Sequence, residues 1–260
     1  MMPLIDTHAH LTGDELYHEA ENLIEKAQAC GVHHIFNIAT DSTTLQRGLM
    51  LNLTHPSVQN IAACTPHDVD RFGDSFFLEV QAAAHQGKLL AIGETGLDYY
   101  YLHSPKEVQI KHLHQYAQLA EHHKLPLVIH CREAFCDLMK VLDQYHRLQS
   151  VIIHCFTGTA DEARACIERG YTLSFSGIIT FKKSIDLQKI CQEMPFNQCV
   201  IETDAPYLAP SHLRGKRNEP AFILETFQKV ATLRNWTRDQ AADILYQNTL
   251  KAFRFEKKSL

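Results

Sequence analysis

The sequence predicts an α/β protein: a single (β/α)₈ barrel of the TIM type with an extra C-terminal helix. Eight short apolar runs recur along the 260 residues, and longer segments with helical periodicity separate them. The spacing of the runs, roughly 25 to 30 residues, fits the repeating unit of a closed barrel better than an open doubly wound sheet. We expect one domain over residues 1–260, with a frayed tail at 255–260.

The expected strands are rich in β-branched and apolar residues, as strands buried on both faces are. In chain order they cover residues 4–5, 34–38, 58–62, 89–92, 127–129, 151–153, 172–175 and 200–201.

Helical periodicity of apolar residues marks segments between these strands, including 15–30, 106–123, 161–169 and 220–234. Gly31 and Gly170 follow two of these segments, where helices prefer to end. The segment 237–253 predicts the extra helix, because Thr237 and Gln240 have the spacing of a capping box.

Composition narrows the class of protein. The chain is 45% hydrophobic and 21% charged, the balance of a globular protein with a large core. Its start lacks the pattern of a secretory signal, and no apolar run approaches membrane-spanning length. The eight cysteines are scattered without a Cys-x-x-Cys pair, which favours reduced thiols. We therefore expect a cytoplasmic protein without a membrane partner.

The formal charge of −5 argues against a protein that coats nucleic acid through an extended basic surface. It does not exclude an enzyme that acts on nucleic acid, because bound divalent cations add positive charge and few phosphates need be held.

A His-x-His pair, His8 and His10, follows the first expected strand. Alternate residues of a strand point to the same side, so the two imidazoles converge. Alone this pattern is a weak signal, since such a pair is more often structural or solvated.

Four further residues of the same chemistry stand at the ends of expected strands: Glu94, His130, His154 and Asp204. The carboxyl ends of barrel strands share one rim, where active sites are built. A single buried histidine there is more often a hydrogen-bonded core residue than a ligand, but six such residues at one rim favour a metal site. Imidazole and carboxylate suit Zn²⁺ or Mn²⁺, and Mg²⁺ if water completes the shell.

Six ligands exceed the needs of one tetrahedral ion, so we expect two divalent metal ions with Glu94 as the bridge. Two such ions would activate a hydroxide and neutralise both oxygens of an in-line displacement, which fits phosphodiester hydrolysis. The catalytic carboxylates are then Glu94 and Asp204, and Asp204 is placed to take the proton of the attacking water.

Three candidate substrate contacts follow the ligands in sequence. Arg132 could hold a phosphate oxygen at the rim, or form a salt bridge with Glu133 or a neighbour. Arg217 lies in a basic run after the last strand, a common phosphate position in barrels, but such a run is as often a solvated loop. Tyr99, Tyr100 and Tyr101 follow Glu94, and one of them, of which Tyr99 is the named candidate, could stack on a terminal base or pack within the protein.

Six segments resemble the signatures of the TatD family of DNases across nearly the whole chain. They are DTHAHL at 6–11, IGETGLDY at 92–99, PLVIHCRE at 126–133, HCFTG at 154–158, ETDAPY at 202–207 and RGKRNEP at 214–220. The six expected ligands match the family's metal positions one for one, and Asn218 in the last motif joins the substrate contacts.

The resemblance implies a divalent-cation-dependent DNase, commonly a 3′-to-5′ exonuclease on single-stranded DNA and sometimes active on RNA, with no obligate protein partner evident. The chain departs from the family pattern at residues 63–67, where Thr65 replaces a histidine, and at His103, which puts the preferred substrate in question.

Two rival functions stay open. The same barrel and ligands serve acyl chemistry, so the substrate could be another ester, a lactone or an amide, including mischarged aminoacyl-tRNA. A non-catalytic protein with structural metals is disfavoured, because structural sites are closed and these ligands lie at an open rim.

Overall fold

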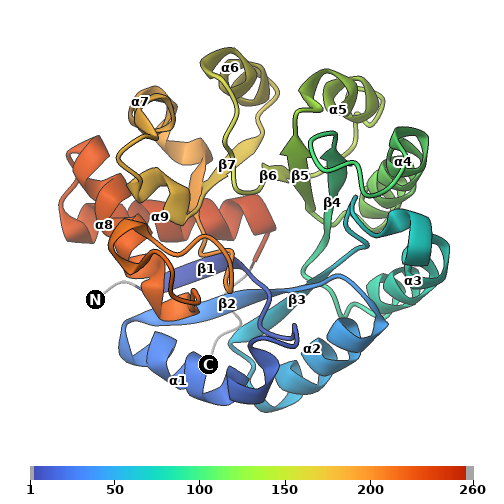
Figure 1. The fold of residues 1–260 in the computed structure, drawn as a ribbon, viewed down its shortest axis with the longest axis horizontal. Coiled ribbons are helices and arrows are strands. Elements are labelled where there is room, and N and C mark those ends of the chain that lie inside the picture. Colours follow the sequence, from blue (N-terminus) through green and yellow to red (C-terminus); the bar gives the residue numbers. More distant parts are fainter. Residues whose placement is uncertain (1–2, 256–260) are drawn as a thin grey trace.

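The structure is a computed structural model that describes residues 3–255, and it confirms the predicted barrel. Eight parallel strands form one sheet in the order β1 to β8, each paired with its neighbour in sequence. In Figure 1 the strands lie in the middle of the molecule and the helices lie around them. The strands are β1 (Leu4–Ala9), β2 (Val32–Ala39), β3 (Val58–Ala62), β4 (Ala91–Asp98), β5 (Leu127–Arg132), β6 (Val151–Ile153), β7 (Thr172–Phe175) and β8 (Cys199–Ile201).

The first and last strands approach each other just beyond the end of β8, which nearly closes the barrel. The amide of His10 donates to the carbonyl of Ala205 at 2.7 Å, and the amide of Asp204 donates to the carbonyl of His8 at 2.9 Å. This junction brings the N-terminal histidines beside a carboxylate almost 200 residues away in sequence.

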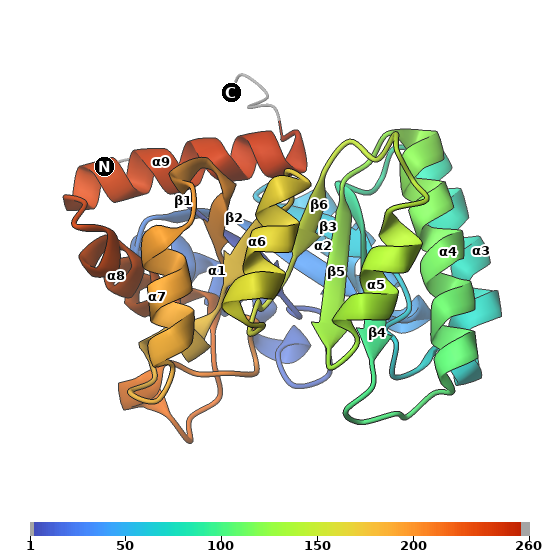
Figure 2. The same ribbon diagram turned by 90° about the horizontal axis from the view of Figure 1, so that it is seen from above.

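Helices cover the outside of the sheet, one after each strand. They are α1 (Ala20–Ala29), α2 (Ser42–Thr54), α3 (Val69–His85), α4 (Lys106–His123), α5 (Phe135–Leu142), α6 (Ala160–Glu168), α7 (Ile185–Glu193) and α8 (Ile223–Arg234). The extra C-terminal helix is α9 (Arg238–Phe253), and it crosses the end of the barrel where the strands begin (Figure 2). The capping box of Thr237 and Gln240 is present as predicted.

The core has two parts. The larger lies between the sheet and the outer helices. The smaller fills the inside of the barrel and is covered by α9, whose Phe253 ring lies 4.8 Å from the ring of Phe36. Because apolar side chains fill the barrel interior, polar chemistry is confined to its ends.

Several predicted boundaries differ from the structure. The first, second and fifth strands, expected at 4–5, 34–38 and 127–129, are longer and cover Leu4–Ala9, Val32–Ala39 and Leu127–Arg132. The fourth strand was expected at 89–92 but runs from Ala91 to Asp98, because its second half contains glycines and polar residues that carry no apolar signal. The segments 15–30 and 220–234 begin with 3₁₀ turns, Tyr17–Glu19 and Pro220–Phe222, before α1 and α8. Apart from Phe255, the expected frayed tail lies outside the described residues.

Candidate metal centre

The structure brings the six predicted ligands together at the carboxyl ends of the strands. His8 lies near the end of β1 and His10 just after it, while Glu94 and His130 lie in β4 and β5. His154 follows β6 directly, and Asp204 lies three residues beyond β8. Barrel topology therefore gathers residues that are far apart in sequence at one rim.

A bulge in β4 aims Glu94 into this rim. The pairing of β4 with β5 shifts by one residue between Ile92 and Thr95, and such bulges turn a side chain out of the regular alternation. Gly96 has a φ of +146°, and a side chain there would collide with the carbonyl of His130. The Gly-Glu-Thr-Gly sequence thus permits the close approach of β4 to β5 that Glu94 requires.

The first group of ligands consists of His8, His10 and Asp204. Oδ1 of Asp204 lies 3.6 Å from Nε2 of His8 and 3.5 Å from Nε2 of His10. Oε2 of Glu94 faces the same two nitrogens, at 3.4 Å and 3.9 Å.

The second group consists of Glu94, His130 and His154. Oε1 of Glu94 lies 2.9 Å from Nδ1 of His130 and 2.9 Å from Nε2 of His154. These two nitrogens are 3.3 Å apart. The two oxygens of Glu94 therefore face two different ligand groups, the geometry expected of a bridging carboxylate.

The bonding of His8 is consistent with a ligand role. Its side chain is fully buried, yet neither ring nitrogen makes a hydrogen bond to any residue of the range 3–255. A buried polar atom without a partner is costly. A cation held between His8, Glu94 and Asp204 would remove that cost, and the donor set of imidazole and carboxylate suits Zn²⁺ or Mn²⁺.

The charges of the cluster keep its central carboxylate ionised. Burial alone would raise the pKa of Glu94, but the surrounding imidazoles of His154, His130 and His8 hold it well below its usual range. Burial opposes the charged form of Asp204 as well, and His10 and its neighbours hold that pKa low. Both carboxylates are thus available as anionic ligands.

Sequence reasoning missed the carboxylates that hold the imidazoles from behind. Oδ2 of Asp98 lies 2.8 Å from Nε2 of His130. Oε1 of Glu202 lies 3.3 Å from Nδ1 of His154 and accepts a hydrogen bond from the amide of Cys155. Asp98 and Glu202 both lie within the quoted motifs, but their histidine partners belong to other strands, so the sequence does not show the contacts.

Arg132 lies at the rim with a free guanidinium. It is exposed, and within residues 3–255 no carboxylate pairs with it, so the predicted alternative of a salt bridge to Glu133 is absent. Its guanidinium carbon lies 3.9 Å from the ring centre of Tyr100 and 4.7 Å from that of Tyr101. Stacking on aromatic rings orients a guanidinium without consuming its hydrogen-bond donors.

Three residues expected at the substrate make contacts within the protein. The Tyr99 hydroxyl donates to Asp137 at 3.0 Å, and Lys106 covers its ring; Tyr100 and Tyr101 are the exposed rings. Arg217 pairs with Glu19 at 3.2 Å.

Asn218 is fully buried, and its amide donates to the carbonyls of Thr203 and Tyr207. Tyr99, Arg217 and Asn218 thus all make polar contacts within the protein, and Asn218 holds the loop that carries Asp204.

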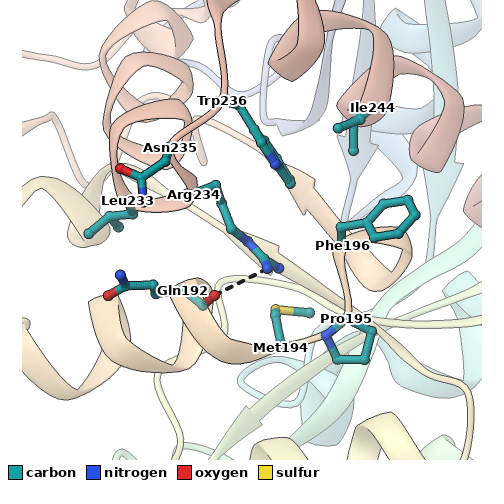
Figure 3. A pocket seen from close by; sticks show the side chains of 9 residues that line it. All are labelled: Gln192, Met194, Pro195, Phe196, Leu233, Arg234, Asn235, Trp236 and Ile244. Atoms are coloured by element: carbon teal, nitrogen blue, oxygen red, sulfur yellow. Dashed lines mark hydrogen bonds between the residues drawn. The ribbon is translucent and has the colours of Figure 1, made fainter.

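A separate hollow of about 540 Å³ lies beside the start of β8, at the opposite end of the barrel (Figure 3). Nη1 of Arg234 donates to the carbonyl of Gln192 at 3.2 Å across it, which caps the C-terminal end of α7. The Arg234 guanidinium lies 5.2 Å from the Trp236 ring. None of the six ligands lines this hollow, which is distinct from the metal centre.

The barrel with histidines and acids at its carboxyl rim defines a metal-dependent hydrolase. The chain belongs to the family described as TatD related DNase, whose sequence model matches residues 5–254. It is 34% identical to an uncharacterized metal-dependent hydrolase of Bacillus subtilis, YabD, over 96% of this chain and 99% of that protein.

Two further relatives agree with this assignment. The 3′-5′ ssDNA/RNA exonuclease TatD of Salmonella typhimurium is 29% identical over 89% of this chain and 91% of that protein. The crystal structure of YjjV, a TatD homologue from Escherichia coli, superposes with a TM-score of 0.92 at 25% identity, covering 97% of this chain and 98% of the other. In the part of the chain that the structure describes, no helix has the length and apolarity needed to cross a membrane.

Proposed function

We propose that this protein is a metal-dependent phosphodiester hydrolase of nucleic acid, acting as a 3′-to-5′ exodeoxyribonuclease on single-stranded DNA. Two divalent ions, Mg²⁺, Mn²⁺ or Zn²⁺, would be held by His8, His10 and Asp204 on one side and by His130 and His154 on the other, with Glu94 between them. The exonuclease among the relatives supports the choice of substrate.

One observation carries the proposal: the two oxygens of Glu94 face separate ligand groups, with Oε2 toward His8 and Oε1 toward His130 and His154. A single closed structural site would need only one of these groups. Two ions, when bound, make water nucleophilic at neutral pH and neutralise charge on the attacking and leaving oxygens.

Asp204 has the position of a proton acceptor. Its Oδ1 faces the two N-terminal imidazoles, which leaves Oδ2 for another partner. The side chain keeps 11% of its surface exposed although its surroundings are buried, so solvent can reach it. A carboxylate held ionised at this point can take a proton from the attacking water at Oδ2.

The rim beside the ligands suits a nucleotide. Arg132 offers planar donors for a phosphate, and Tyr100 and Tyr101, which are 54% and 51% exposed, offer rings on which a base of any identity can stack. Tyr207, which is 52% exposed, meets the His10 ring edge-on at 5.6 Å and adds a further exposed ring beside a ligand.

The test uses single-stranded oligonucleotides labelled at the 3′ or the 5′ end, incubated with Mg²⁺, Mn²⁺, Zn²⁺ or EDTA. Stepwise, metal-dependent shortening from the 3′ end, absent in Glu94→Ala, is the expected result. Metal-loaded protein that cuts no oligonucleotide would contradict the proposal. Activity on esters, lactones, amides or aminoacyl-tRNA instead would establish the acyl alternative, which the shared barrel allows.

We further propose that residues 1–260 form one domain that works in the cytoplasm. The uninterrupted sheet supports a single domain, and the eight unpaired thiols fit a reducing compartment. A single cooperative unfolding transition of the metal-free protein would test the domain assignment.

A further inference from the structure

Asp98, the last residue of β4, has a carboxylate that joins two parts of the rim. The residue is 1% exposed. Its backbone is clamped by the buried side chain of Gln109, which accepts from the amide of Asp98 at 2.8 Å and donates to its carbonyl at 3.1 Å. The backbone of Asp98 is therefore held by α4 and not by the metal ligands.

One carboxylate oxygen contacts a metal ligand. Oδ2 lies 2.8 Å from Nε2 of His130, whose Nδ1 lies 2.9 Å from Glu94. An ionised carboxylate only accepts hydrogen bonds, so Asp98 favours a hydrogen on Nε2 of His130. A metal ion at Nδ1 would require the same arrangement, because the lone pair of Nδ1 would bind the ion and the hydrogen of the neutral ring would lie on Nε2.

The other oxygen holds a turn. Oδ1 accepts from the amide of Tyr100 at 3.0 Å and from the amide of Tyr101 at 2.8 Å. The rings of these tyrosines lie beneath the guanidinium of Arg132. The same carboxylate thus fixes the aromatic surface that orients Arg132.

We propose that Asp98 is a positioning residue that sets the His130 tautomer through Oδ2 and the Tyr100–Tyr101 turn through Oδ1, so that metal and nucleotide binding share one anchor. The inference rests on the proposed function for the roles of His130 and Arg132. Nothing in it requires Asp98 to touch metal or substrate.

The variant Asp98→Asn separates the two roles. An amide oxygen at the Oδ1 position keeps both bonds to the turn, because the opposite orientation would set an NH₂ group against two backbone amides. The NH₂ group then faces Nε2 of His130, which must accept, so the hydrogen moves to Nδ1 and blocks the lone pair.

Two measurements without substrate test the effect of Asp98 on His130. Nitrogen-15 spectra of Zn²⁺-loaded protein should show a hydrogen on Nε2 of His130 in the wild type, and this signal should be lost in Asp98→Asn. Calorimetric titration with Mn²⁺ alone should show affinity about 10- to 100-fold weaker in the variant, the usual effect of losing such a partner. Asp137→Asn, which alters a carboxylate near the same turn without contacting His130, should leave both results unchanged.

Steady-state kinetics on an oligonucleotide test the effect of Asp98 on the Tyr100–Tyr101 turn. At saturating metal, Asp98→Asn should leave KM unchanged, whereas Asp98→Ala, which also releases the turn, should raise it, the sign of lost substrate binding. Equal KM values in the two variants would overturn this half of the inference.

The first half is overturned if Asp98→Asn binds Mn²⁺ as tightly as the wild type, or if wild-type His130 carries its hydrogen on Nδ1. The wild-type spectrum decides the question even if the variant does not fold. Because spectra and metal titration involve no substrate, absence of nuclease activity would contradict the proposed function without touching this result.

Discussion

His8 and His154 lie face to face, with ring centroids 4.1 Å apart and planes 11° from parallel. The His8 ring belongs to the first ligand group and the His154 ring to the second, so the two groups are in direct contact. Glu94 contacts both rings: its Oε2 lies 3.4 Å from Nε2 of His8, and its Oε1 lies 2.9 Å from Nε2 of His154. The two groups form one compact centre, and a change at Glu94 should disturb both.

Replacement of Glu94 by Gln should therefore empty the whole centre and not half of it. The amide of Gln carries no negative charge, so it should not hold two cations. Without the metal ions the transition state of hydrolysis loses several kcal/mol of stabilisation, which corresponds to a rate reduction of about 10³-fold. Elemental analysis after dialysis should find near-complete loss of bound metal. Glu133→Gln, which alters an exposed carboxylate just beyond Arg132, serves as the control. One ion retained per chain in Glu94→Gln would disprove the bridging role.

Metal removal should lower thermal stability, because an ion that binds only the folded chain stabilises it by mass action. At 100 times its Kd, one bound ion adds about 2.7 kcal/mol. For a chain of this size that corresponds to a Tm change of about 5 °C or more. Differential scanning calorimetry with Mn²⁺ and with EDTA measures the shift. Glu94→Gln should show no difference between the two conditions, and a wild-type Tm indifferent to EDTA would argue against the site.

Arg132→Ala should weaken oligonucleotide binding and its dependence on salt. Each phosphate contact on a single strand contributes about 0.7 to the slope of log K against log salt, so the slope should fall by about that amount. KM measured at several salt concentrations gives the value. Arg217→Ala is the matched control, because that guanidinium already pairs with Glu19. The same loss of slope in both variants would mean that the effect is one of net charge.

Asn218→Ala should destabilise the fold rather than remove a substrate contact. The amide of Asn218 donates to the carbonyl of Thr203 in a buried bond and to that of Tyr207 in a part-buried one, on either side of Asp204. An unsatisfied buried carbonyl costs about 1–3 kcal/mol, so urea unfolding should show a loss of about 2 kcal/mol. Arg217→Ala, next to it but exposed, should cost about 1 kcal/mol or less. Unchanged stability of Asn218→Ala with a raised KM would restore the substrate role that the sequence suggested.

The sequence was most informative where local pattern and chemistry coincide. The expected strand at 58–62 and the expected helix at 106–123 match β3 and α4 residue for residue, because β-branched runs and helical periodicity are local signals. Boundaries failed where glycine and polar residues continue a strand, as in β4. There the pairing with β5, and not propensity, decides the conformation.

The sequence alone determined the fold class and the set of six residues at one rim, since barrel topology sends every strand end to the same face. Only the tertiary structure showed that the two oxygens of Glu94 point to different groups and that Asp98 backs His130. Among the three consecutive tyrosines, it showed that Tyr100 and Tyr101 are exposed whereas Tyr99 bonds to Asp137. These features depend on side-chain hydrogen bonds between segments distant in sequence, and no local pattern encodes such partners.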